Sequence, residues 1–552
     1  MENSKLRIQI LEDEYWWGGC VNLGHEMPYG AQSEGFFDLN GGRENDQFAP
    51  LMLSSKGRYV WGDQSFQASI KDGVIEVNGE GRVELCAEAE LPCREQLSGR
   101  EPQKRSPQSR SPQSQSPQSR SPQAAHASLR GAYLAAMKER FPFSGELPDK
   151  LFWQMPQYNT WIELGTEQTT EKILGYARGI LENGLPAGIL MIDGGWQEDY
   201  GVFEFHRGKI LEPKYLIDSL HELGFRVMLW VSPIVACAGT NYKQLRDKGY
   251  LVKNAEGKPA IREWWSGYSA VLDFTNPEAV RWYQEKLDRL MHCYGVDGFK
   301  FDAGDRYFYA DDDITFQPVT AREQTRRFNE VGEAYSLNEF RAAWNYGGRA
   351  IVARLHDKYH TWNSFGLNTL IPHTILQGLC GYAYCCPDMV GGGIIDSFSP
   401  DKQIDEELFI RWVQANALMG MMQISIAPWR IFGEETYDII RKYILLHETM
   451  GSYCVKLAEE AARSGEPIVR HMAYQYPGQG FETTNDQFML GDHILSAPVL
   501  EKGKRERAVK LPEGLWKESD GTIYEGGQTV IVKAPLQKLP WFERVDALAI
   551  SG

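Results

Sequence analysis

Segments with strand character alternate with segments with helix character from about residue 151 to residue 447. Residues 189–193 and 226–231 are apolar runs typical of buried strands. A helix is predicted to begin at Pro277, because Asn276 can cap it and proline is favoured at the first helical position. Alternation of this kind predicts a parallel sheet covered by helices. No glycine-rich phosphate loop follows the predicted strands, so we expect an α/β fold built on a (β/α)8 TIM barrel and not a doubly wound sheet.

Short β-type segments flank the predicted barrel on both sides. Residues 6–95 contain several of them, joined by turns, which is typical of an antiparallel β-sandwich. Similar segments return after the barrel region. At 552 residues the chain exceeds what one hydrophobic core usually supports. We therefore expect an N-terminal β-sandwich over residues 1–150, the catalytic barrel over 151–447 and a C-terminal β domain over 448–552.

A low-complexity repeat interrupts the first predicted domain. The pentad Ser106-Pro107-Gln108-Ser109-Arg110 recurs with little change through Gln123 and contains no aliphatic or aromatic side chain. Such a segment cannot bury apolar surface, and its prolines favour an extended, hydrated chain. The sequence predicts a disordered insertion over about residues 98–126; a basic tail that docks a partner is the alternative.

Composition restricts the partners of the protein. The formal net charge of −16 argues against nucleic acid and against an anionic membrane surface. No apolar run reaches membrane-spanning length, and the first residues lack the apolar core of a signal peptide. The nine cysteines show no metal-binding spacing, so we expect reduced thiols in a cytoplasmic protein without metal or cofactor. A small-molecule substrate is the expected partner, and a homo-oligomer remains open.

Asp302 lies where a barrel enzyme keeps its catalytic groups. It follows the apolar segment Val296–Phe301 directly, at the expected C-terminal end of a buried strand. Lys300 precedes it by two positions, on the same side of a strand, and can hold the carboxylate ionised. An ionised, positioned carboxylate suits nucleophilic attack on a sugar carbon. A strand that ends in a solvated acidic loop is the structural alternative.

A second carboxylate is needed for glycoside hydrolysis, and Asp357 is the best candidate. It follows the apolar segment Ile351–Ala353, with Arg354 between them. A surface Arg–Asp pair would give the same pattern. A metal-dependent hydrolase is disfavoured, because no His, Asp or Cys spacing suits a metal.

Several motifs stand in the order found in glycoside hydrolase family 31, which the chain resembles over most of its length. They are Ile192-Asp193-Gly194-Gly195-Trp196, Trp265-Ser266-Gly267 with Asp273-Phe274-Thr275-Asn276-Pro277, Lys300-Phe301-Asp302, and Pro387-Asp388-Met389-Val390-Gly391-Gly392. Arg354–Lys358, Phe409–Trp412 and Tyr15–Gly19 resemble segments of the α-galactosidase branch of that family. Gly194 and Asn363 differ from the residues that are common at these positions among its members. The resemblance therefore does not determine which sugar the protein recognises.

The resemblance implies an exo-acting, retaining double displacement on terminal α-linked sugars, with Asp302 as nucleophile and Asp357 as acid/base. Their carboxyl groups should then lie about 5–5.5 Å apart. Arg354 beside Asp357 would favour the ionised acid, so we expect it to bind a substrate hydroxyl instead. The other residues expected at the substrate, with core packing as the alternative for each tryptophan, are Asp193, Lys300, Trp17, Trp196, Trp230, Trp265, Trp362 and Ser425. Asp305 and Asp388 are expected to have a structural role or to contact other site residues, and not to act on the substrate.

The resemblance favours an α-galactosidase acting on small galactosides or related oligosaccharides. The α-glucosidase, α-xylosidase and sulfoquinovosidase specificities would share the fold and the carboxylates. A carbohydrate-binding pseudoenzyme, which keeps the barrel without turnover, is the alternative from another class.

Overall fold

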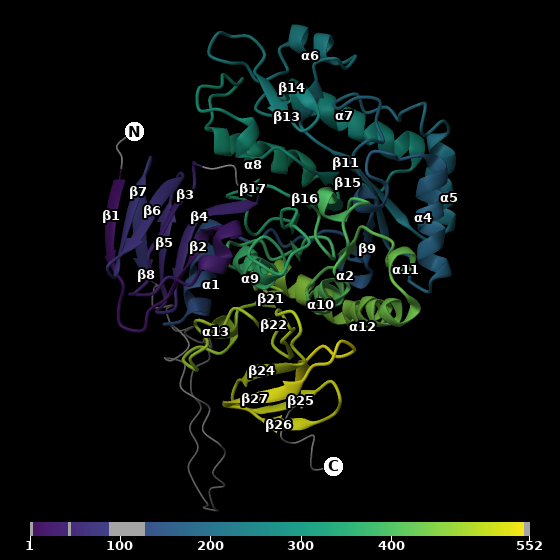
Figure 1. The fold of residues 1–552 in the computed structure, drawn as a ribbon. Helices are drawn as coiled ribbons and strands as arrows, with labels where there is room; N and C mark the ends of the chain where they lie inside the picture. The colour runs from purple at the N-terminus through teal and green to yellow at the C-terminus, as the bar shows by residue number, and fades with distance from the viewer. Residues whose placement is uncertain (1–3, 42–45, 88–126, 546–552) are drawn as a thin grey trace, which may run out of the picture.

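The computed structural model describes residues 4–41, 46–87 and 127–545 (Figure 1). The Ser-Pro-Gln repeat, and with it the predicted insertion up to residue 126, lies outside the described residues. In Figure 1 an N-terminal group of strands lies to the left of the barrel, and a smaller C-terminal β domain lies below it. None of the helices in the described part of the chain combines the length and the apolarity needed to span a bilayer.

The centre of the molecule is an eight-stranded sheet in the order β19-β18-β16-β15-β11-β10-β9-β20. All neighbouring strands in this order run parallel, which gives a nearly closed barrel. Its strands are β9 (Gln157–Asn159), β10 (Ile189–Ile192), β11 (Arg226–Val231), β15 (Gly298–Phe301), β16 (Leu337–Phe340), β18 (Val352–Arg354), β19 (Cys385–Cys386) and β20 (Gln423–Ile424). The predicted TIM barrel is confirmed.

Helices follow the barrel strands along the chain and lie around the sheet (Figure 1). They include α4 (Thr170–Glu182), α5 (Pro213–Glu222), α7 (Pro277–Tyr294), α8 (Ala321–Gly332), α9 (Leu370–Leu379) and α10 (Glu406–Ala417). Helix α7 begins at Pro277 as predicted, and the Asn276 side chain accepts a hydrogen bond from the Glu278 amide at 3.0 Å. It ends at Gly295, whose φ of 86° lies in the left-handed region that glycine adopts at low cost.

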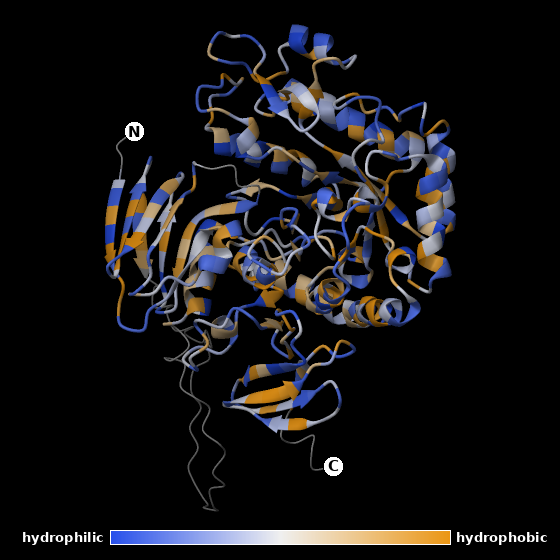
Figure 2. Cartoon of the chain, viewed as in Figure 1, coloured by the Kyte–Doolittle hydropathy of each residue, from blue (hydrophilic) through white to orange (hydrophobic). Residues whose placement is uncertain are grey.

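The N-terminal strands form two antiparallel layers, and the second layer includes a strand from the barrel region. One sheet has the order β1-β7-β6-β3 and the other the order β17-β4-β5-β8, with β2 paired to β4. The strands are β1 (Ser4–Gln9), β2 (Trp16–Cys20), β3 (Gly35–Asp38), β4 (Gln47–Ser54), β5 (Arg58–Gly62), β6 (Phe66–Lys71), β7 (Val74–Gly79), β8 (Val83–Ala87) and β17 (Ala343–Trp344). Figure 2 shows hydrophobic and hydrophilic residues alternating along β6 and β7, as expected for strands with one buried face.

The strand β17 joins the sandwich to the barrel. It pairs in parallel with β4, with Ala343 opposite Gln47. Gln47 also donates from its side-chain amide to the carbonyl oxygens of Arg341, at 2.5 Å, and Arg354, at 2.8 Å. The sheet that contains β4 therefore fixes the backbone of two arginines at the ends of barrel strands.

The C-terminal part begins after α12 (Glu434–Ser464), a 31-residue helix that packs against α10. Its larger sheet has the order β21-β22-β23-β28-β25-β26, and a second sheet pairs β24 with β27. The strands are β21 (Val469–Arg470), β22 (Phe488–Leu490), β23 (Ile494–Ser496), β24 (Glu506–Leu511), β25 (Leu515–Glu518), β26 (Ile523–Glu525), β27 (Gln528–Lys533) and β28 (Trp541–Val545). They enclose a separate hydrophobic core around the fully buried Trp516, so the predicted C-terminal β domain is present.

Candidate active site

A cavity of about 530 Å³ opens at the carboxyl ends of three neighbouring barrel strands. Asp302 follows β15, Arg341 follows β16, and Asp357 follows β18. The cavity is lined by Glu263, Trp264, Trp265, Asp302, Asp305, Tyr307, Phe308, Arg341, His356, Asp357 and Ile394. The structure thus brings both predicted catalytic carboxylates to the wall of one cavity, at the end of the barrel where such enzymes act.

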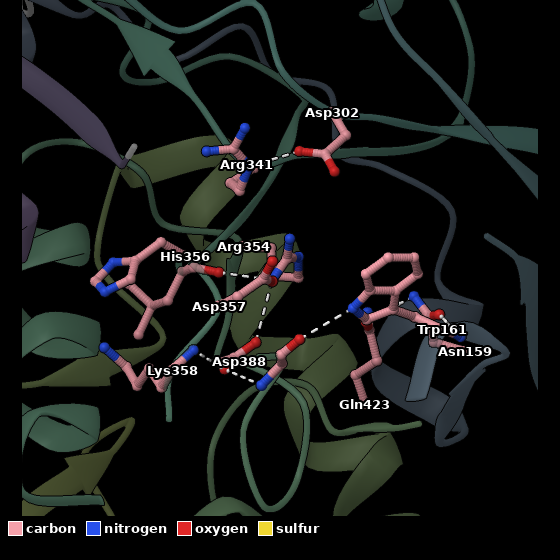
Figure 3. Close-up of polar contacts among 12 residues, drawn as sticks. Asn159, Trp161, Asp302, Arg341, Arg354, His356, Asp357, Lys358, Asp388 and Gln423 are labelled. Atoms are coloured by element: carbon pink, nitrogen blue, oxygen red, sulfur yellow. Dashed lines mark hydrogen bonds and ion pairs between the residues drawn. The ribbon is translucent and has the colours of Figure 1, made fainter. Parts of the chain in front are cut away.

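Asp302 is held by directed hydrogen bonds on both carboxylate oxygens. Arg341 donates from Nε to Oδ1 at 2.5 Å (Figure 3). Trp230 donates from Nε1 to Oδ2 at 2.8 Å. Burial alone would raise the pKa of Asp302, but the charges of Arg341, Lys300 and Arg354 hold that pKa well below its usual range. Asp302 is therefore an oriented carboxylate whose surroundings favour the ionised form.

Lys300 acts on Asp302 through space and not through a direct contact. Its ammonium group donates to Asp193 Oδ2 at 2.7 Å, and both side chains are almost fully buried. Burial opposes its charge, but the Asp193 carboxylate raises the pKa of Lys300 above its usual value. The lysine therefore stays charged and contributes to the ionisation of Asp302, while its hydrogen bond fixes Asp193.

Asp357 lies beside Arg354, which corrects an expectation from the sequence. Arg354 Nη1 donates to Asp357 Oδ1 at 2.8 Å, and its side chain is only 1% exposed (Figure 3). It also contacts Asp388 Oδ1 at 3.1 Å and lies 3.2 Å from Glu339 Oε1. Arg354 is thus a buried partner of three carboxylates, and the expectation that it leaves Asp357 to bind a substrate hydroxyl is wrong for this structure.

Only part of the predicted set of tryptophans reaches the cavity. Trp265, 60% exposed at the turn between β13 (Ile261–Trp264) and β14 (Gly267–Val271), lines its mouth. Trp230 is buried and contributes through its bond to Asp302. The half-buried Trp362 does not line the cavity and donates to Asp405 at 3.0 Å.

Three residues expected at the substrate are structural instead. Trp196 is fully buried and donates to the Trp230 carbonyl at 2.8 Å. Trp17 is buried, with its ring 5.2 Å from that of His471. The buried Ser425 hydroxyl accepts a hydrogen bond from the Ile162 amide. Their side chains have no free face to offer a sugar, because core packing or backbone contacts occupy them.

Arg341 and His356 are cavity residues that sequence reasoning missed. Arg341 also donates to Asp305 at 3.0 Å, so it holds two carboxylates at once. The strand-end pattern that singled out Asp302 applies equally to Arg341, which directly follows the apolar end of β16. His356 Nδ1 lies 2.6 Å from Asp46 Oδ2, a contact between the N-terminal part and the barrel that no local pattern reveals.

One group of side chains in the described ranges could offer three ligand atoms to a metal ion. Asp46, His356 and His373 place such atoms within 4.8 Å of one another. Both ring nitrogens of His373 are already engaged, however. Lys358 Nζ donates to Nδ1 at 3.0 Å, and His25 Nδ1 lies 3.0 Å from Nε2. A histidine whose nitrogens both have partners fits a hydrogen-bonded network better than a metal centre.

Comparison with known proteins identifies the family. A parallel barrel with two carboxylates at the carboxyl ends of nearby strands is an arrangement typical of glycosidases. The model of the glycosyl hydrolases family 31 TIM-barrel domain matches residues 153–457, and that of the glycosyl hydrolase family 31 C-terminal domain matches residues 465–548. The chain belongs to glycosyl hydrolase family 31.

Relatives in this family differ in length and in activity. The mouse myogenesis-regulating glycosidase is 32% identical over 410 residues, which cover 72% of this chain and 57% of the mouse protein. The alpha-xylosidase XylQ of Lactiplantibacillus pentosus is 27% identical over 66% of this chain and 49% of its own length. The chain thus spans about half the length of these relatives.

Solved structures share the fold at low sequence identity. The dextranase of Flavobacterium johnsoniae superposes with a TM-score of 0.80 at 19% identity, over 98% of this chain and 66% of that chain. The cycloalternan-degrading enzyme of Trueperella pyogenes gives a TM-score of 0.79 at 18% identity, over 99% of this chain and 81% of that chain. These likenesses support the fold alone.

Proposed function

We propose that this protein is a retaining α-glycosidase that removes terminal α-linked sugars, with galactose as the favoured sugar. One observation carries the proposal. Asp302, kept ionised by Arg341, and Asp357, which is a third exposed, line the same cavity at the carboxyl end of the barrel. An oriented carboxylate and a second, more accessible one are the two groups that glycoside hydrolysis by double displacement requires.

The proposed reaction has two steps. Asp302 attacks the anomeric carbon while the bond from that carbon to the glycosidic oxygen breaks, and Asp357 gives its proton to the departing oxygen. Asp357, now ionised, then takes a proton from water, and the oxygen of that water displaces Asp302 from the anomeric carbon. The sugar leaves with its original anomeric configuration, and both carboxyl groups return to their starting states.

The preference for galactose rests on sequence similarity. Residues 354–358 and 409–412 resemble the α-galactosidase branch of the family. Named relatives include an alpha-xylosidase and the sulfoquinovosidase of Escherichia coli, which is 24% identical. The sugar must therefore be established by measurement.

Hydrolysis of a panel of aryl α-glycosides tests the proposal. The panel contains the galactoside, glucoside, xyloside, N-acetylgalactosaminide and sulfoquinovoside, with the Asp302→Ala variant as control. We expect turnover of the galactoside above the others, a product of retained configuration, and no turnover by the variant. Preference for another sugar would contradict the proposed galactose specificity and leave the proposed glycosidase activity in place. No turnover of any member by folded protein would favour a carbohydrate-binding protein that lacks catalysis.

A further inference from the structure

Asp357 shares its arginine with a second carboxylate. Arg354 Nη1 lies 2.8 Å from Asp357 Oδ1 and 3.1 Å from Asp388 Oδ1, and it also donates to the Leu355 carbonyl at 2.9 Å (Figure 3). One nitrogen therefore serves three acceptors. A guanidinium shared in this way is bound less tightly by each acceptor than one paired with a single carboxylate.

Asp388 is fixed in place and closed to the substrate. Its side chain is completely buried, and Oδ2 accepts hydrogen bonds from the Lys358 amide at 2.7 Å and the Gly393 amide at 2.9 Å. Its other oxygen, Oδ1, is the one directed at Arg354. A Cβ at Gly393 would lie 2.7 Å from Asp357 Oδ1 and 2.9 Å from Asp388 Oδ1, so both carboxylates approach one point.

The arrangement resolves a conflict between Arg354 and the acid step. An arginine paired with Asp357 alone would stabilise the ionised carboxylate and deprive the acid of its proton. Asp388 adds a negative charge at the same guanidinium and competes for the same nitrogen. Glu339 adds a further negative charge at a different nitrogen of the guanidinium, 3.2 Å from Arg354 Nε.

We propose that Asp388 is a positioning residue that lets Asp357 carry a proton beside Arg354, because it takes up part of the charge of that arginine. The proposal rests on the proposed function, since it concerns the proton that the acid must donate. Two carboxylates close to one cation behave as a pair that binds its proton at a higher pH than either would alone.

The charges around the pair agree with this role. Besides Arg354, two further cations act here: Arg341 interacts with Asp357, and Lys358 interacts with both carboxylates. Burial, and then the charge of Asp357, raise the pKa of Asp388 above its usual value. The two carboxylates therefore disfavour being charged at the same time.

Replacing Asp388 by asparagine tests the proposal through a pH profile. Asp388→Asn keeps the size of the side chain and removes its charge. Arg354 should then interact more strongly with Asp357 and stabilise its ionised form. For an alkyl glycoside, whose leaving group needs a proton, we expect the basic limb of kcat/KM to move to lower pH by about one unit or more. For an aryl glycoside with a good leaving group, the limb should move much less. A lower rate with the limb unmoved would mean a structural role only and would overturn the proposal.

Two further variants separate an effect at Arg354 from a general effect of net charge. Glu339→Gln removes the other carboxylate beside Arg354 and should move the limb in the same direction. Asp297→Asn is the matched control: it removes a partly buried carboxylate that pairs with Arg226 before β15, and it should leave the limb in place. Equal shifts in Asp297→Asn and Asp388→Asn would show a general effect of net charge and would contradict the role assigned to Asp388.

A measurement without substrate separates this inference from the proposed function. The infrared band of protonated carboxyl groups, assigned by its loss in Asp357→Asn, follows the titration of Asp357 directly. In Asp388→Asn that titration should occur at lower pH than in the unaltered protein. An unchanged or raised titration would overturn the inference even in an active enzyme. The expected shift in a protein that hydrolyses no glycoside would support the inference while the proposed function fails.

Discussion

Two carboxylates on one cavity wall have opposite surroundings at the scale of single residues. Asp302 receives hydrogen bonds on both oxygens and faces Arg341, Lys300 and Arg354. Asp357 accepts a hydrogen bond from Arg354, which it shares with Asp388. This difference supports the proposed roles of Asp302 as nucleophile and Asp357 as acid, because enzymes separate two carboxyl roles by separating their environments.

Loss of the Arg341 charge should affect the nucleophile. Arg341→Gln removes a charge-assisted hydrogen bond, a class of interaction worth about 1.5–3 kcal/mol, so we expect kcat/KM at neutral pH to fall by about 10- to 100-fold. Since Arg341 lowers the pKa of Asp302, its loss should raise that pKa and move the acid limb of kcat/KM to higher pH. Arg349→Gln, which removes a surface pair with Glu333, should change neither quantity. An acid limb that stays in place would contradict the role of Arg341.

Removal of the acid should depend on the leaving group. Asp357→Ala is expected to lower kcat by about 100- to 10,000-fold on alkyl glycosides, the usual contribution of general acid catalysis. Aryl glycosides with good leaving groups should lose much less in the first step, because they need no proton. Added azide should restore turnover on these aryl substrates and yield the glycosyl azide with retained configuration. Equal losses on both substrate types would argue against the acid role.

At the scale of elements, the ends of three adjacent strands place the reactive groups. The strand-end pattern in the sequence was sufficient to predict Asp302 and Asp357 as candidates, because apolar runs that end in charged residues are visible locally. The same pattern could not separate Trp196 from Trp265. Both tryptophans follow strands, and only the packing of distant segments decides that one is enclosed and the other exposed.

Contacts across the chain were beyond prediction from the sequence. Gln47 belongs to β4, yet it binds the carbonyls of Arg341 and Arg354 and accepts a hydrogen bond from Gln377 at 2.6 Å. Nothing in its local sequence distinguishes it from other glutamines in short strands. Its partners lie about three hundred residues away, as the separations of 294 and 307 positions show.

The position of Gln47 suggests a test of how the sandwich supports the site. Gln47→Ala removes the side-chain donor to two carbonyls, at about 1–3 kcal/mol for each one left unsatisfied, and frees the backbone beside both arginines. We expect kcat to fall by about 10-fold or more, together with a lower thermal midpoint. Gln67→Ala on β6, whose side-chain bond to Asp38 is exposed, is the control and should affect neither. Activity unchanged in a destabilised Gln47→Ala protein would limit Gln47 to a role in folding.

For the whole molecule, buried histidines predict how stability depends on pH. Burial lowers the pKa of both His447 and His471 to about 4. An unfolded histidine titrates near pH 6.5, so the unfolded state binds more protons between about pH 4 and 6.5. Stability should therefore fall as the pH drops through this range, by about 1.4 kcal/mol per pH unit for each group.

Urea unfolding at pH 7 and pH 5 checks this expectation. His447 donates from Nδ1 to the Ala417 carbonyl at 3.2 Å, and Nε2 is buried without a hydrogen-bond partner in the described structure. His447→Gln should therefore show a smaller loss of the urea midpoint between the two pH values than the unaltered protein. His292→Gln, on the exposed surface of α7, should keep the full loss. Equal losses in all three proteins would exclude His447 as a source of acid sensitivity.

The pairing of β17 with β4 has a consequence for how this protein could be recombined with its relatives. β17 follows the cavity residue Arg341 closely along the chain and pairs with β4, so the sandwich supports the segment that carries this arginine. A barrel transplanted without residues 46–48 would lack the donors to two of its arginine carbonyls and the partner of His356. Exchange of specificity within the family should therefore succeed when both parts are inherited as one module, and fail when the junction is cut at the start of the barrel.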